Sequence, residues 1–130
     1  MSELTENEVA AVVVDAAIQI HSTLGPGLFE VVYETCLEHE LKKRGLSVQR
    51  QVPIPVVYDS VHFDEAFVAD LIVNRKVILE LKSIESLLPV HKKQLLTYLK
   101  LANKRLGLLL NFGAPLMKDG MVRLANNLTE

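Results

Sequence analysis

The spacing of apolar residues predicts two helices at the start of the chain. Thr5 and Glu8 have the separation of a capping box, and apolar residues then recur at helical period, so we expect a helix over about residues 6–22. The run "LGPGL" ends it, because glycine favours a helix C-terminus and proline cannot continue the backbone hydrogen bonds. A second helix is expected over about residues 28–44, ending at Gly45.

Strands are predicted over the middle of the chain, followed by a third helix. Residues 47–58 are rich in β-branched residues and contain Pro53 and Pro55, which are tolerated chiefly at sheet edges, so this segment is expected to be an edge strand. A helix begins at Pro89, within "PVHKKQLLTYLKLANK", and the apolar run "LGLLLNF" predicts a buried strand. Two further strands are expected over about residues 63–73 and 76–84, and a short last strand at "MVRLA".

Composition places the chain among ordinary globular proteins. Its 130 residues are 49% hydrophobic and 23% charged, which is enough to bury one core, so we expect a single domain over residues 1–130. The start "MSELTENE" is acidic and does not resemble a secretory signal, which predicts a cytoplasmic protein. The apolar stretch "VAAVVVDAAIQI" is shorter than the roughly 20 residues of a membrane span, so no membrane association is expected.

Cysteine content and charge exclude several kinds of site. A single cysteine, Cys36, forms neither an intramolecular disulfide nor a zinc or iron–sulfur site built from several cysteines, and it is expected to fill the core. The formal net charge of −2 argues against a protein that holds nucleic acid by bulk charge. Any binding of nucleic acid must therefore come from a local basic patch.

Three charged residues interrupt two apolar strands in the stretch "ADLIVNRKVILELKS". Because strand side chains alternate between faces, Asp70 shares a face with Val68 and Ile72, while Glu80 and Lys82 share one with Ile78. A solvated outer sheet face is the alternative, but the same face is rich in isoleucine and valine. A buried charge must be paired or bind a metal, so these residues are candidates for a functional site.

The turn between these strands decides whether the two acids meet. A three-residue loop over residues 74–76 pairs Val73 with Val77 and places Asp70 opposite Glu80. Facing carboxylates destabilise a sheet, so a cation between them is the natural compensation. A two-residue loop would put the acids on opposite faces and remove the site.

The second helix carries another candidate acid. At about 100° per residue, Tyr33, Leu37 and Leu41 lie within roughly 60° of Glu30, so Glu30 is expected in the stripe that faces the protein, with Glu34 at its margin. A glutamate at the edge of the stripe with its carboxylate in water is the alternative.

A cluster of carboxylates next to a lysine suits metal-assisted hydrolysis. Acidic oxygen ligands favour Mg²⁺, for which Mn²⁺ can substitute, and this cation also binds substrate phosphate oxygens. Lys82 is placed to orient the attacking water or to stabilise charge in the transition state. A structural salt bridge between Lys82 and one acid is the alternative role.

These residues resemble a known family. Asp70, Glu80 and Lys82 on adjacent strands, after a helix with Glu30, resemble the signature of the PD-(D/E)XK nuclease superfamily. More closely, Gly27, Glu30 and Tyr33 in "HSTLGPGLFEVVYE" resemble the motif of the bacterial GxxExxY family. The segments "FVADLIV", "VILELKS", "HKKQLLTYLK" and "GLLLNFG" follow in the same order, so the resemblance covers about residues 15–113.

The resemblance implies an α/β restriction-endonuclease-like core, a mixed β-sheet flanked by helices in the order α-α-β-β-β-α-β. It implies that Asp70, Glu80 and the backbone carbonyl of Leu81 hold Mg²⁺, that Lys82 is the catalytic lysine, and that Glu30 holds a water on the metal or a second cation. Gln94 falls where related nucleases carry a glutamine near the site, and Tyr98 lies one helical turn later. His91 is expected at the surface, and for His21 a place in the pocket and a packing role both stay open.

Substrate contacts are predicted on the third helix. Lys92, Lys93 and Lys100 form a candidate ridge for phosphate groups, with a merely solvated helix face as the alternative. The absence of tryptophan and the presence of only three tyrosines give little support for stacking on bases. The domain is too small to surround a duplex, so a homodimer or a larger protein partner is expected.

Three functions fit these observations. The first is a Mg²⁺-dependent nuclease that hydrolyses phosphodiester bonds in DNA or RNA, with DNA favoured over RNA. The second is a non-catalytic module with a nuclease fold that recruits or regulates a nucleic-acid-processing complex. The third is a metal-dependent hydrolase of a small phosphorylated molecule. The complete set of acids together with Lys82 favours the first.

Overall fold

The computed structural model describes residues 3–129, and its elements follow the predicted order closely. A short 3₁₀ helix between the last two strands was not predicted. The helices are α1 (Glu6–Leu24), α2 (Glu30–Lys43), α3 (Pro89–Ala102) and the 3₁₀ helix η1 (Met117–Asp119). The strands are β1 (Val48–Tyr58), β2 (Val61–Val73), β3 (Val77–Lys82), β4 (Leu106–Asn111) and β5 (Met121–Ala125).

The predicted ends of α1 are confirmed. The Glu8 amide N–H donates to Thr5 Oγ1 over 3.2 Å, and the Thr5 amide N–H donates to Glu8 Oε1 over 2.9 Å, which completes the capping box. The helix ends at Gly25, whose φ of 80° lies in the region that glycine adopts without a steric penalty. The "LGPGL" run therefore turns the chain as its composition predicts.

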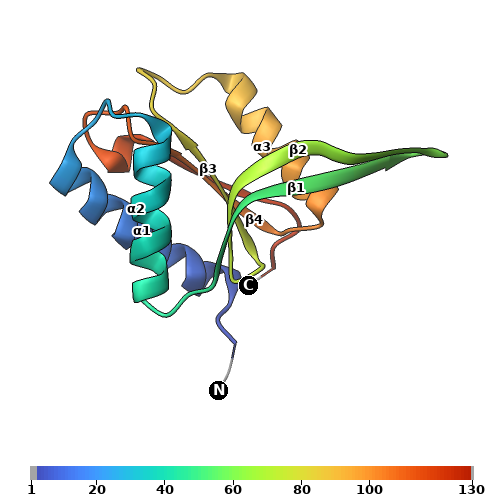
Figure 1. Cartoon of the computed structure of the whole chain (residues 1–130), viewed down its shortest axis with the longest axis horizontal. Coiled ribbons are helices and arrows are strands. Elements are labelled where there is room, and N and C mark those ends of the chain that lie inside the picture. Colours follow the sequence, from blue (N-terminus) through green and yellow to red (C-terminus); the bar gives the residue numbers. More distant parts are fainter. Residues whose placement is uncertain (1–2, 130) are drawn as a thin grey trace.

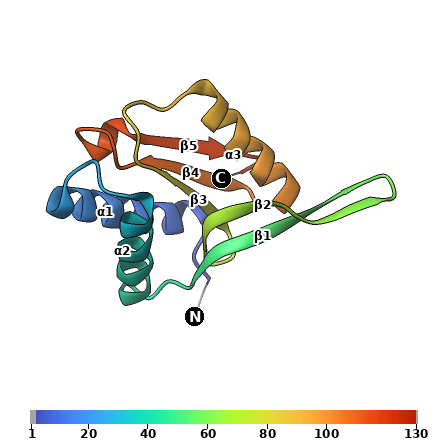
Figure 2. The same cartoon turned by 45° about the horizontal axis from the view of Figure 1, so that its top comes forward.

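The five strands form one mixed sheet in the order β1-β2-β3-β4-β5. Strands β3 and β4 are parallel, and every other neighbouring pair is antiparallel. Helices α1 and α2 cover one face of the sheet and α3 covers the other (Figures 1 and 2). The predicted α/β architecture is confirmed, and so is the edge position of β1, which Pro53 and Pro55 indicated.

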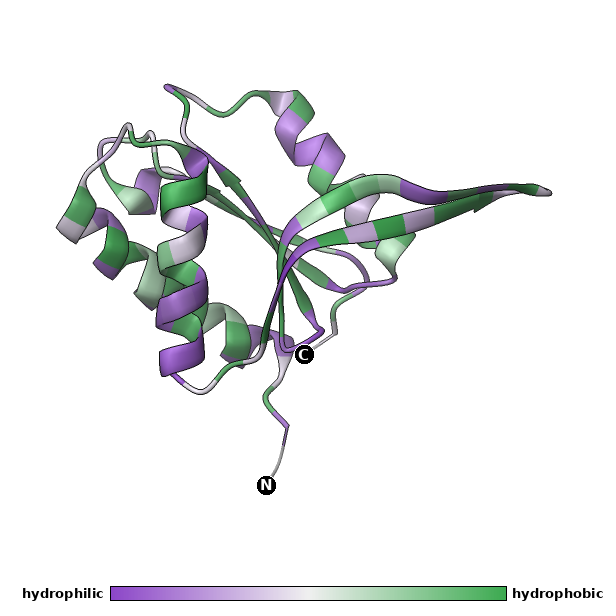
Figure 3. Ribbon diagram, viewed as in Figure 1, coloured by the Kyte–Doolittle hydropathy of each residue, from purple (hydrophilic) through white to green (hydrophobic). Residues whose placement is uncertain are grey.

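A two-stranded ribbon projects beyond the sheet. Strands β1 and β2 pair up to the tip, at Tyr58 and Val61, well past the point where β2 leaves β3 (Figure 1). Hydrophobic residues continue along this ribbon (Figure 3). Tyr58 is 78% exposed at the tip and Phe63 is 60% exposed.

Tyr33 ties the connection between α1 and α2 to the core. Its ring is fully buried and stacks on Phe112 with 4.3 Å between ring centroids. Its hydroxyl donates to the carbonyl oxygen of Gly25 over 2.5 Å and accepts the amide N–H of Leu28 over 3.1 Å. One side chain therefore fixes both ends of the turn that sets where α2 begins.

Tyr33→Phe is expected to lower the free energy of unfolding by about 1–3 kcal/mol. The substitution keeps the ring packing but leaves the Gly25 carbonyl and the Leu28 amide without their partner. Chemical denaturation measures the change. Tyr58→Phe, at an exposed tyrosine, is the matched control and is expected to change little. Equal effects of the two substitutions would contradict the role of the Tyr33 hydroxyl.

No helix within residues 3–129 has the length and hydropathy that a membrane span needs.

Candidate active site

The hairpin between β2 and β3 brings the two strand acids to the same place. Val73 pairs with Val77 across a three-residue loop, so the predicted register is confirmed. Asn74 and Arg75 in this loop have φ values of 51° and 57°, in the left-handed region that such turns use. The paired positions end at Leu71 and Leu79. The next positions along the two strands hold Asp70 and Glu80, where β2 and β3 separate.

We call the point where β2 and β3 separate, at Asp70 and Glu80, the fork. Here the two carboxylates accept hydrogen bonds from backbone N–H groups of the opposite strand. Asp70 Oδ2 accepts the amide N–H of Leu81 over 2.9 Å, and Glu80 Oε1 accepts the amide N–H of Asp70 over 3.4 Å. Glu80 is only 9% exposed, and Asp70 is half-buried. Each acid is thus held against the backbone of the opposite strand, and the two side chains are brought face to face.

The environment of Glu80 opposes its negative charge. Burial, followed by the charge of Asp70 and the hydrogen bond between the two side chains, raises the pKa of Glu80 from 4.5 to about 9. The charge of Lys82 lowers this pKa, but its effect is smaller. Without a bound cation, Glu80 is therefore protonated at neutral pH, and a cation between the carboxylates would favour the ionised pair.

Lys82 lies beside the acids without neutralising either of them. It follows Glu80 by two residues at the end of β3 and is half-buried. Among residues 3–129, no acid lies within 4.0 Å of its ammonium group, so the salt bridge considered as its alternative role does not form. The Lys82 charge is left available to a ligand.

The burial of the acids on α2 is the reverse of the prediction. Glu30 is exposed, whereas Glu34 is only 7% exposed, so the placement of Glu30 in the inward-facing stripe is wrong. The reason is that α2 begins at Glu30, which puts this residue in the first turn, where a carboxylate interacts favourably with the helix dipole. Glu34, one turn later, is the acid that faces the sheet.

Two polar residues of β1 hold the buried Glu34. Arg50 Nη2 lies 3.2 Å from Glu34 Oε2, and Gln51 Nε2 donates to Glu34 Oε1 over 2.6 Å. Gln51 Nε2 also lies 3.5 Å from Asp70 Oδ1, which links Glu34 to the strand acids. Sequence reasoning did not select Glu34 or Gln51. The signals were the place of Glu34 at the margin of the inward-facing stripe and the polar run of Gln49, Arg50 and Gln51 in a strand otherwise rich in valine and proline.

Helix α3 brings one predicted residue to the acid pair. Tyr98 is half-buried, and its ring stacks on Phe67 with 3.8 Å between centroids. Burial, followed by the charges of Glu80 and Asp70, raises the pKa of Tyr98, which places it within electrostatic reach of both acids. Gln94 lies one turn earlier on α3 and is exposed, as are the three predicted substrate lysines, Lys92, Lys93 and Lys100.

The two histidines considered at the sequence level have structural partners. His91 Nδ1 accepts the amide N–H of Leu88 over 3.0 Å and so caps the start of α3. His21 is buried, with its Nε2 atom 2.8 Å from the carbonyl oxygen of Ala114. Of the two roles left open for His21, the structure therefore supports packing.

The donor set at the fork fits a hard divalent cation that keeps open positions. Two carboxylates with oxygen donors suit Mg²⁺, and a cation between them would offset their mutual repulsion. Within residues 3–129, no group of three or more acidic, histidine or cysteine side chains is arranged as a metal site. A cation at Asp70 and Glu80 would take its other ligands from backbone oxygen, water and substrate, as Mg²⁺ commonly does.

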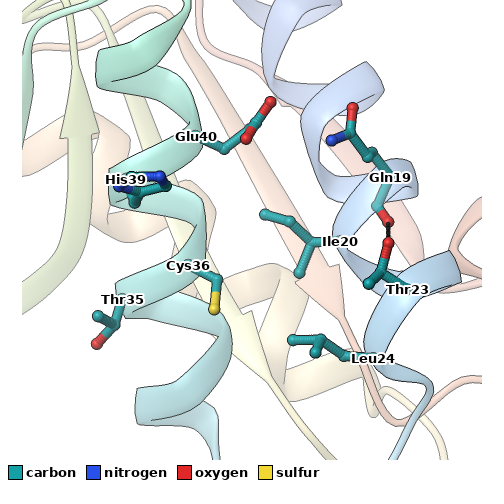
Figure 4. Close-up of a pocket in the computed structure, with 8 residues that line it drawn as sticks. All are labelled: Gln19, Ile20, Thr23, Leu24, Thr35, Cys36, His39 and Glu40. Carbon is teal, nitrogen blue, oxygen red and sulfur yellow. Dashed lines mark hydrogen bonds between the residues drawn. The ribbon is translucent and has the colours of Figure 1, made fainter.

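A separate pocket of about 410 Å³ lies between α1 and α2 and includes none of the fork residues. Ile20, Leu24 and the thiol of Cys36 point into it (Figure 4). Cys36 is half-buried at its wall and packs against the main hydrophobic core, so its predicted place in the core is confirmed in part. The surface of this pocket is mainly apolar, and its lining includes one acid, Glu40, rather than two acids that face each other. The fork is therefore the better candidate for chemistry.

Comparisons with known proteins agree with this fold. The family model of the PD-(D/E)XK nuclease superfamily matches residues 7–124. The crystal structure of SSO0001 is similar in fold, with a TM-score of 0.54 and 19% sequence identity. That match covers 98% of this chain and 72% of SSO0001. No match was found among curated proteins.

Proposed function

The chain belongs to the PD-(D/E)XK nuclease superfamily, and we propose that it is a Mg²⁺-dependent nuclease that hydrolyses phosphodiester bonds in DNA or RNA, with DNA favoured. The observation that carries this proposal is the buried carboxylate pair at the fork, next to an unpaired Lys82. Nucleases of this superfamily generally use divalent metal ions. The choice of Mg²⁺, with Mn²⁺ as a substitute, rests on the oxygen donors of the pair.

The proposed roles follow from position. Asp70, Glu80 and the backbone carbonyl of Leu81 would hold the cation, which would polarise the phosphate and lower the pKa of a bound water. Lys82 orients the attacking water and balances the charge that builds up on the phosphate oxygens. The water oxygen forms a bond to phosphorus while the bond from phosphorus to the leaving oxygen breaks. The proton lost by the water goes to solvent, and the leaving oxygen takes up a proton.

Glu30 and Gln94 are proposed as supporting residues at the open side of the fork. The Ser83 hydroxyl donates to the carbonyl oxygen of Leu28 over 2.6 Å, which joins the residue after Lys82 to the segment just before Glu30. An exposed carboxylate at this place can hold water at the site or a second cation. Gln94 shares a face of α3 with Tyr98, which supports its place near the acids.

We also propose that the chain belongs to the GxxExxY subfamily, because the structure gives each residue of that motif a physical role. Gly27 has a φ of 91°, which favours glycine, and Tyr33 fixes the same turn with its hydroxyl. Glu30 is the first residue of α2. The motif then describes a turn that presents an acid beside the end of β3.

We propose that Lys92, Lys93 and Lys100 contact the phosphates of the substrate. All three are exposed on α3, and no acid within residues 3–129 pairs with them. Their charges are therefore free for a polyanion, even though the formal net charge of the chain is −2.

Lys93→Glu combined with Lys100→Glu is expected to weaken nucleic-acid binding and to reduce its salt dependence. Each lost phosphate contact lowers the slope of log K against log salt by about 1. Binding is measured by fluorescence anisotropy at several salt concentrations. Lys118→Glu, at an exposed lysine on η1, reverses one charge and is the control for Lys93→Glu alone. The same loss in the control would assign the effect to net charge and contradict a specific ridge.

A cleavage assay tests the proposed activity. Labelled single-stranded and double-stranded DNA and RNA are incubated with the protein and Mg²⁺, and with a chelator as the control. Cleavage that needs the metal and is greatest on DNA is expected. A small phosphorylated substrate in the same assay separates the third hypothesis from the first. No cleavage of any substrate would overturn the nuclease proposal.

The non-catalytic alternative has one observation in its favour. No third acid joins Asp70 and Glu80 in a metal site within residues 3–129, which would suit a protein that keeps the fold and has lost activity. Nucleic-acid binding without cleavage is the outcome that favours it. We also propose a homodimer or a larger protein partner, because a domain of this size cannot surround a duplex.

A further inference from the structure

Gln51 occupies an irregular position in β1, next to the fork. On either side of it, Arg50 pairs with Leu71 and Val52 pairs with Ala69, while Gln51 and Asp70 do not pair. The φ of Gln51 is 52°, a left-handed value that a residue with a long side chain seldom adopts within a strand. Such strain persists only where the surrounding structure enforces it, and it is common at functional sites.

The side chain of Gln51 connects two carboxylates. Its Nε2 atom donates to Glu34 Oε1 over 2.6 Å and lies 3.5 Å from Asp70 Oδ1. The other oxygen of Asp70, Oδ2, accepts the amide N–H of Leu81. Both oxygens of Asp70 are thus approached by donors from neighbouring strands, and these two contacts restrict rotation of the carboxylate.

Glu34 holds the side-chain amide of Gln51 from the side of α2. It is buried on α2, and its second oxygen, Oε2, lies 3.2 Å from Arg50 Nη2. Arg50 is itself held, because its Nη2 also donates to Thr35 Oγ1 over 2.8 Å. Arg50, Glu34, Gln51 and Asp70 therefore form one continuous chain of contacts from α2 to the fork.

We propose that Gln51 is a positioning residue, which holds the Asp70 carboxylate in the orientation that binds the divalent cation. This inference rests on the proposed function, since it assigns a task to the same site. A neutral amide suits the task because it donates N–H groups to both Glu34 and Asp70 without neutralising either. A lysine here would pair with Asp70 and compete with the cation, while a glutamate would add a third negative charge. Partners that orient a metal ligand in this way affect metal affinity strongly.

Gln51→Gly removes the amide without adding backbone strain, because glycine adopts a φ of 52° freely. We expect it to weaken Mg²⁺ binding, measured by calorimetry, by about 10- to 100-fold, with a matching loss of kcat and little change in KM for the nucleic acid. Gln49→Gly, two residues earlier in β1 and exposed, is the control for a glycine in this strand.

The outcomes separate this inference from the proposed function. If the wild type binds Mg²⁺ and cleaves DNA while Gln51→Gly keeps its Mg²⁺ affinity within twofold, the inference is overturned and the proposed function stands. A lower melting temperature with unchanged Mg²⁺ affinity gives Gln51 a structural role only, and this also overturns the inference. If the wild type binds no Mg²⁺, the metal-dependent proposal and this inference fall together.

Discussion

Lys82→Ala should abolish cleavage of nucleic acid, with kcat lowered by about 100- to 1,000-fold and the fold intact. Loss of one preorganised group that stabilises transition-state charge typically has an effect of this size. Lys82 is suited to that role because it lies on the same face as Glu80 and pairs with no acid within residues 3–129. Its substitution therefore removes no structural ion pair.

The effect of Lys82 is measured as single-turnover rates on the preferred substrate, together with a thermal melt of each variant. Lys82→Met keeps much of the apolar stem and is expected to be as inactive as Lys82→Ala, which separates charge from packing. Lys118→Ala, at an exposed lysine on η1, is the control and should keep full activity. Activity retained in Lys82→Ala would remove this residue from the mechanism.

Glu80→Gln should make the metal-free protein more stable than the wild type at neutral and alkaline pH. The folded state holds the pKa of Glu80 at about 9 against an ordinary value of 4.5, so folding favours the protonated acid. Below pH 4.5 Glu80 is protonated in both the folded and the unfolded protein, so its ionisation does not change the stability. As the pH rises from about 4.5 to 9, the unfolded chain ionises first, and the folded protein loses stability. Glutamine mimics the protonated acid and removes this loss, which reaches about 3 kcal/mol at pH 7.

Chemical denaturation of both proteins between pH 4 and pH 9, in the presence of a chelator, measures this difference. The two stabilities should converge at pH 4 and separate as the pH rises. Glu85→Gln, at an exposed acid shortly after β3, is the control and should follow the wild type. Added Mg²⁺ should stabilise the wild type more than Glu80→Gln. A Glu80→Gln variant that is less stable than the wild type at pH 8 would contradict the burial of like charges at the fork.

The strand acids could be found from the sequence because local rules determine their position. Side chains alternate along a strand, and the three-residue loop after Val73 sets the register, so Asp70 and Glu80 had to meet on one face. The capping box at Thr5 and the prolines of β1 were equally local signals. These features need only neighbouring residues in the chain.

The contacts of Glu34 and Gln51 could not be found in this way. A helical wheel gives relative angles, and the predicted stripe of Tyr33, Leu37 and Leu41 is buried. The wheel does not show how far along α2 this burial extends, because that depends on where the helix starts. The left-handed backbone at Gln51 interrupts strand periodicity, and no residue type marks it, since glutamine is unusual there. The separation of β2 from β3 is likewise a tertiary feature.

Calorimetric titration of Mg²⁺ into the wild type and into Glu80→Ala tests the central claim that the fork is a metal site. We expect saturable binding to the wild type and loss of that binding in Glu80→Ala. Melting temperatures of both proteins confirm that the variant is folded. Absence of binding to the wild type, or equal binding to both proteins, would contradict the account and leave Asp70 and Glu80 as a structural pair of acids.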